Sequence, residues 1–151
     1  ERQHPEKYLP LLVKKILRGE VVTIHTDPTK TKPARRSYIH ARNVWNVVRF
    51  LCEAPRVDVV GERYNITGDR EVDCFDLALM VSRILNITVH HEFVDFHSSR
   101  PGHDLRYALS GAKLAGTGFQ QPVSFEASLE QTVKWFEAHP EWLGFTKKEA
   151  A

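Results

Sequence analysis

The stretch DCFDLALMVSRILNITVHHEFVDF, residues 73–96, places a helix pattern directly before a strand pattern. Asp73 is a good N-cap, and the apolar residues behind it recur at helical spacing: Leu77, Met80, Val81 and Ile84. After Leu85 the helical spacing stops, and residues 89–96 are rich in β-prone side chains. Helix and strand patterns alternate in the same way along the rest of the chain, which predicts an α/β or α+β fold.

Working outward from this stretch, we expect short strands and about four main helices. The helices are predicted at residues 5–18, 42–53, 73–85 and 124–138, with a shorter one at 110–115. The extended segments are predicted at residues 21–25, 36–40, 63–67 and 89–96. In the second helix we expect four apolar side chains to point inward: Val44, Val47, Val48 and Leu51.

The composition indicates an ordinary globular domain of 151 residues with a net charge of +2. So small a net charge gives no reason to expect nucleic acid as a partner. No apolar run approaches the roughly 20 residues that a membrane span requires. Cys52 and Cys74 lie in separate apolar segments, and we interpret both as reduced core residues of a cytoplasmic protein.

The residues that stand out chemically are at 99–107, SRPGHDLRY. Arg100, His103, Arg106 and Tyr107 surround a Pro-Gly turn, so several donors can point at one anion. This pattern predicts a site for phosphate or carboxylate. The alternative is a surface loop in which Arg100 simply pairs with Asp104.

Two further groups of polar residues are weaker candidates. Arg35 and Arg36 begin an extended run and could face a ligand or only solvent. Asn65 could bond to backbone or to ligand if it is buried. The eight histidines do not predict a metal site, because they show no metal-ligand spacing and adjacent His90 and His91 on a strand would face opposite ways.

Signatures of redox catalysis are absent from these 151 residues. No glycine-rich dinucleotide turn occurs, and no tyrosine is followed four residues later by lysine. We therefore predict no catalytic residues and no cofactor binding by this chain alone.

Four stretches together resemble the C-terminal half of the extended short-chain dehydrogenases/reductases. They are HPEKYLP at 4–10, RSYIHARN at 36–43, GERYNI at 61–66 and RPGHDLRYA at 100–108. The last stretch is the most specific, and it is most similar to the dTDP-glucose 4,6-dehydratase branch of the NAD-dependent epimerase/dehydratases. Asn43 in place of the usual aspartate, the lysine-rich 27–33 loop and Phe119 in place of a common tryptophan depart from the family pattern.

The resemblance implies a nucleotide-sugar-binding role for residues 1–151, as a fragment of a longer NAD-dependent enzyme whose N-terminal Rossmann half is missing. It implies that Lys7 and the Tyr8 backbone lie near the nucleotide diphosphate, and that Arg36 contacts the nucleotide or its phosphates. It also implies that Asn65 holds the nucleotide end, and that Arg100 and His103 bind the pyrophosphate.

Because helix faces meant for the missing half would be exposed, we also expect self-association. The alternatives are a stand-alone binding module for nucleotides or nucleotide-sugars, which would not be catalytic, and a structural or partner-binding domain without a ligand.

Overall fold

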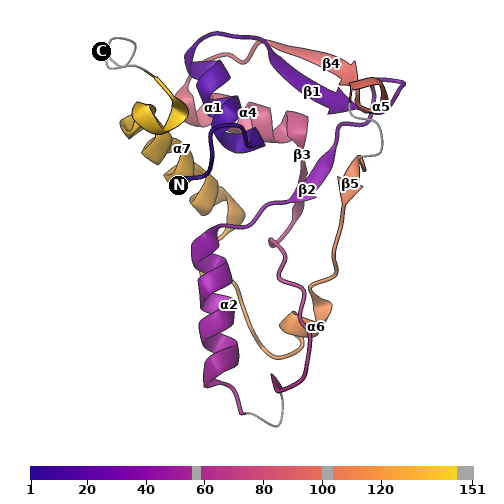
Figure 1. The fold of residues 1–151 in the computed structure, drawn as a ribbon, viewed down its shortest axis with the longest axis vertical. Coiled ribbons are helices and arrows are strands. Elements are labelled where there is room, and N and C mark those ends of the chain that lie inside the picture. Colours follow the sequence, from indigo (N-terminus) through magenta and orange to yellow (C-terminus); the bar gives the residue numbers. More distant parts are fainter. Residues whose placement is uncertain (56–58, 100–103, 146–151) are drawn as a thin grey trace.

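The computed structural model describes residues 1–55, 59–99 and 104–145 of the chain. Three helices, α1 (Tyr8–Leu17), α4 (Cys74–Leu85) and α7 (Phe125–Ala138), pack together in the upper part of Figure 1. Their apolar faces form most of the main core, whose fully buried large side chains include Leu12, Ile16, Leu77, Val81, Val133 and Phe136. The apolar periodicity of the sequence thus produces the packing that it predicts.

A two-stranded parallel sheet covers one side of these helices. Strand β1 (Val22–Thr26) pairs with β4 (His91–Asp95), and Val22 lies opposite His91. In β1 the buried residues Val22, Ile24 and Thr26 alternate with half-buried ones, so one face of the strand points into the core.

A second sheet of three very short strands links the core to the rest of the molecule. Strand β2 (Arg35–Ser37) lies in the middle, antiparallel to β3 (Glu71–Asp73) and parallel to β5 (Arg106–Tyr107). Residues far apart in the sequence therefore meet at β2, whose pairing with β5 extends over only two residues, Arg35 with Arg106 and Arg36 with Tyr107.

Below this sheet, helix α2 (Ala41–Glu53) projects away from the main helices, and the chain returns through an irregular segment and short α6 (Ala112–Ala115) (Figure 1). Helix α2 buries Val47 and packs Phe50 against Phe119, with 5.3 Å between the ring centroids. Trp45 on the same helix is 63% exposed. The remaining described elements are α5 (Phe96–Ser99) and the 3-10 helix η1 (Pro140–Leu143).

Local capping signals explain where the helices begin. The Asp73 carboxylate accepts hydrogen bonds from the amides of Phe75 and Asp76, at 2.9 and 2.8 Å. The Ser124 hydroxyl accepts from the Ala127 amide, at 3.2 Å. The Asp73 cap was predicted from the sequence and is confirmed, and the Ser124 cap lies where the sequence predicted the start of the last helix.

Three sequence predictions are wrong. Residues 63–67 form no strand, because no neighbouring strand in the described residues pairs with them; the strand of this region is β3 instead. Cys52 is exposed and only Cys74 is buried, because Cys52 lies on the side of α2 that faces away from Val47. Val48 is 42% exposed, since α2 has packing partners on one side only within the described residues.

Asn43, the residue that departs from the family pattern, has a structural role. It is 2% exposed, and its amide nitrogen donates to the Val123 carbonyl at 2.7 Å and to Gln121 Oε1 at 3.1 Å. These bonds fasten α2 to the segment that precedes α7. An ionised aspartate could not make them, because it has no hydrogen to donate.

Candidate functional site

Arg36, one of the predicted site residues, is held in place by hydrogen bonds and by an aromatic ring. Its Nη1 donates to the carbonyls of Arg35 and Leu105, at 2.6 and 2.7 Å, and its Nη2 donates to the Asp104 carbonyl at 2.9 Å. The guanidinium also lies over the Tyr107 ring, 4.2 Å from its centroid. The parallel pairing of β2 with β5 causes this arrangement, because it places Arg36 opposite Tyr107.

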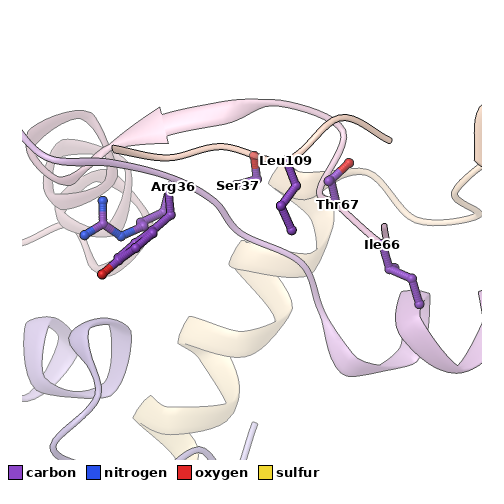
Figure 2. A pocket seen from close by; sticks show the side chains of 6 residues that line it. Arg36, Ser37, Ile66, Thr67 and Leu109 are labelled. Atoms are coloured by element: carbon purple, nitrogen blue, oxygen red, sulfur yellow. The ribbon is translucent and has the colours of Figure 1, made fainter. Parts of the chain in front are cut away.

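Beside Arg36 lies an open cavity of about 140 Å³. Its walls come from β2, from β5 with the residues after it, and from the irregular segment before β3; the lining residues are Arg36, Ser37, Ile66, Thr67, Tyr107 and Leu109. In Figure 2 the side chains of Ile66, Thr67 and Leu109 lie on one side, and the Arg36 guanidinium points away from them. The cavity therefore combines apolar walls, three hydroxyl-bearing side chains and a cation at its edge.

The irregular wall of this cavity is held by contacts with distant residues. The Gln121 side chain donates to the Thr67 carbonyl at 2.5 Å. Gly68 packs directly against the backbone of Tyr38, since a Cβ at this glycine would lie 2.1 Å from the Tyr38 carbonyl oxygen. Thr67 is thus fixed beside β2 although it belongs to no strand.

Lys7 and Tyr8 lie at the start of α1 and do not line the cavity. Lys7 is the exposed N-cap residue. The Tyr8 hydroxyl donates to the Cys74 carbonyl at 2.7 Å and so joins the start of α1 to the start of α4. Burial, with the neighbouring Cys74 and Tyr38, raises the pKa of Tyr8 above its usual value, so the phenol remains a donor.

The other predicted site residues differ in how far the structure describes them. Asn65 is exposed next to Ile66, and its amide donates to the Ser110 carbonyl at 3.2 Å. Arg100 and His103 lie outside the described residues. The residues that follow them, Asp104 and Leu105, are the ones whose carbonyls bind Arg36.

The sequence did not indicate four residues that line the cavity: Ser37, Ile66, Thr67 and Leu109. Tyr107 belongs to the donor-rich stretch, but nothing local indicates that its ring meets Arg36. That contact depends on a strand pairing between residues about 70 positions apart, and a single sequence carries no signal for it.

A second cavity, of about 270 Å³, lies on the outer side of α4. Two of its charged residues already have partners: Arg70 pairs with Glu126 at 2.5 Å, and Glu71 receives two hydrogen bonds from Arg106, at 2.8 and 2.6 Å.

Within residues 1–55, 59–99 and 104–145, no group of His, Cys, Asp or Glu is arranged to hold a metal ion. None of the helices in these ranges is both long and apolar enough to cross a membrane.

Comparison with known proteins places this geometry in context, although no family model matches the chain. A trifunctional UDP-glucose 4,6-dehydratase, 3,5-epimerase and reductase of Arabidopsis thaliana is 30% identical over 142 residues, which are 94% of this chain and 20% of that protein. The dTDP-glucose 4,6-dehydratase 1 of Escherichia coli K12 is 28% identical over 97% of this chain and 40% of its own length.

Solved structures agree with these matches. The dTDP-glucose 4,6-dehydratase of Bacillus anthracis in complex with NAD superposes with a TM-score of 0.76 and 28% identity, over 94% of this chain and 42% of that one. A UDP-glucuronic acid 4-epimerase of Bacillus cereus shares the fold, with a TM-score of 0.75 at 20% identity. The chain spans about 40% of the bacterial dehydratases that it matches. Over nearly its whole length, it is related to part of the NAD-dependent nucleotide-sugar dehydratases and epimerases.

Proposed function

We propose that residues 1–151 are the nucleotide-sugar-binding part of an NAD-dependent 4,6-dehydratase that acts on a dTDP-glucose-like substrate. In this proposal the chain binds and orients the substrate, and the chemical step needs residues that the chain does not contain. Fixing a substrate in a reactive geometry can account for a large part of a rate enhancement. The homology with dTDP-glucose 4,6-dehydratases supports the substrate class.

The observation that carries this proposal is the contact between Arg36 and the carbonyls of Asp104 and Leu105. This contact joins residues 36–43 to residues 100–108, the two arginine-containing stretches that resemble the dehydratases. We assign the substrate diphosphate to Arg36, Arg100 and His103. We further propose that Asn65 contacts the nucleotide end of the substrate. Lys7 and the Tyr8 backbone lie near the diphosphate in this proposal.

The turn after β1 does not fit NAD, so we derive no step through that cofactor. The turn after β1 runs from Asp27 to Pro33 and contains no glycine. The Asp27 carboxylate fills this turn, because it accepts hydrogen bonds from the amides of Thr31 and Lys32, both at 2.9 Å. A dinucleotide turn instead needs glycines, so that the backbone can approach a pyrophosphate. In the proposed enzyme, NAD belongs to an N-terminal half that pairs with this chain.

The binding role can be tested by calorimetry with dTDP-glucose, dTDP, UDP-glucose and UDP. We expect dTDP-glucose to bind, and the Arg100→Ala variant to lose at least about tenfold in affinity, which corresponds to one charge-assisted hydrogen bond. Arg83→Ala is the matched control, because Arg83 is an exposed arginine on α4 that does not line the Arg36 cavity. Equal losses in both variants, or no binding at millimolar ligand either by the chain alone or after an N-terminal half from a homologous dehydratase is added, would refute the proposal.

A second candidate is a stand-alone binding module for nucleotides or nucleotide-sugars. The observation that favours it is the cavity of about 140 Å³ beside Arg36, which brings a cation, hydroxyl-bearing side chains and apolar walls together. Micromolar affinity in the same titration, without any second polypeptide, supports the module. Affinity that appears only after adding an N-terminal half from a homologous dehydratase supports the larger enzyme. A dehydratase assay on this chain with NAD alone is expected to show no turnover.

The exposed apolar side of α2 favours binding to a protein partner. Without that partner, we expect this surface to cause self-association. Trp45 and Val48 are 63% and 42% exposed, one helical turn apart. We expect light scattering to show concentration-dependent association that decreases in a Trp45→Gln variant. Replacing Leu11, an apolar residue on α1 that is 37% exposed, with glutamine is the control and is expected to change association little. A monomer at every concentration would contradict this prediction.

A further inference from the structure

The Arg36 guanidinium is largely occupied by the protein itself. Arginine has five N–H donors, and three of them are directed at the backbone carbonyls of Arg35, Asp104 and Leu105. The Tyr107 ring lies over the guanidinium. The other two donors have no acceptor in the part of the chain that the structure describes, so most of the hydrogen bonding of this side chain holds backbone in place.

These bonds reinforce a short strand pairing. Strands β2 and β5 pair over two residues, and the Arg35 amide donates to the Leu105 carbonyl at 2.8 Å. Arg36 adds a second donor to that carbonyl and one to the carbonyl before it. On the other side of the sheet, Arg106 of β5 makes a two-bond ion pair with Glu71 of β3, which lowers the pKa of that carboxyl.

We propose that Arg36 is a positioning residue, which fixes the backbone of Asp104 and Leu105 against β2. The expected effect of Arg36 on ligand binding rests on the proposed function, which assigns Arg100 and His103 to the diphosphate. These two residues come shortly before Asp104 in the sequence, so fixing Asp104 restricts where they can lie. The role needs the planar fork of arginine, which can reach two consecutive carbonyls at once. Lysine keeps the charge but has a single compact ammonium, so it cannot hold the same geometry.

The first test uses the protein without ligand. Amide hydrogen exchange at residues 104–107 is expected to rise by about tenfold or more in both Arg36→Lys and Arg36→Met, with exchange in β1 and β4 unchanged. Arg35→Lys and Arg35→Met are the matched controls, because Arg35 is the exposed neighbour on the same strand and its side chain makes no hydrogen bond within residues 1–55, 59–99 and 104–145. Wild-type exchange at residues 104–107 in Arg36→Lys would overturn the proposal.

The second test measures dTDP binding as a function of salt. Positioning predicts that Arg36→Lys loses about tenfold in affinity while the slope of log affinity against log salt stays as in the wild type, because the charge is retained. If Arg36→Lys binds dTDP as tightly as the wild type, charge alone suffices and the positioning role is refuted. If dTDP binds to none of the proteins, with or without an added N-terminal half from a homologous dehydratase, the proposed function fails, and the exchange experiment still decides whether Arg36 holds the backbone.

Discussion

Replacing Tyr8 with phenylalanine is expected to destabilise the fold by about 1 kcal/mol, the usual net value of one intramolecular hydrogen bond. The change keeps the ring and removes only the hydroxyl, which donates to the Cys74 carbonyl at 2.7 Å. In a chain of this size, such a loss lowers the melting temperature by about 2–4 °C. Binding of dTDP is expected to change by less than about twofold, because only the Tyr8 backbone is assigned to the ligand.

Tyr38→Phe is the matched control for this prediction. The Tyr38 hydroxyl contacts the same residue, but its neighbour is Cys74 Sγ at 4.0 Å, and sulfur is a weak acceptor. Its removal is expected to cost less than about 0.5 kcal/mol in denaturant unfolding. If Tyr8→Phe has wild-type stability, or if Tyr38→Phe loses as much, the hydroxyl of Tyr8 does not join α1 to α4 as described.

The pH dependence of the Tyr8 effect follows from its raised pKa. Burial favours the neutral phenol in the folded protein, whereas the unfolded chain ionises with a pKa near 10.0. The stabilisation is therefore complete below pH 10 and is lost as the pH rises above it. The stability difference between wild type and Tyr8→Phe is expected to shrink above pH 10. A difference that grows in that range would contradict the assignment.

Three further substitutions test the segments around the site. Asn43→Asp is expected to lower the free energy of unfolding by more than about 2 kcal/mol, because a buried carboxylate cannot donate to the Val123 carbonyl. An equal loss in Asn43→Gly would argue against an effect of the charge. Gly68→Ala is expected to cost about 1–3 kcal/mol in denaturant unfolding, because its Cβ would meet the Tyr38 carbonyl; wild-type stability would refute this close approach. The neutral His40 ring caps α2 by accepting a hydrogen bond at Nδ1, and burial lowers the pKa of this ring. The stability that the neutral ring contributes is therefore present above about pH 6.5 and is lost as the pH falls below it. A His40→Asn variant is expected to lose less stability between pH 7 and 5 than the wild type, and an unchanged pH profile would count against the cap.

The predicted site could be recognised from sequence only in part. The donor-rich stretch at 99–107 and the arginines at 35–36 were both identified, because their composition is unusual within a few residues. Nothing local indicated that the two stretches touch, or that the Arg36 donors end on backbone carbonyls. Such contacts depend on side-chain directions that are set by pairing between distant strands.

Local signals in the amino-acid sequence determined the four long helices and the caps formed by Asp73 and Ser124, since capping and helical spacing act over about four residues. The tertiary structure alone decided that residues 71–73 form a strand while 63–67 do not, and that Trp45 and Cys52 face outward. The physical reason is that a strand exists only where another backbone satisfies its hydrogen bonds, and a side chain is buried only where another element covers it.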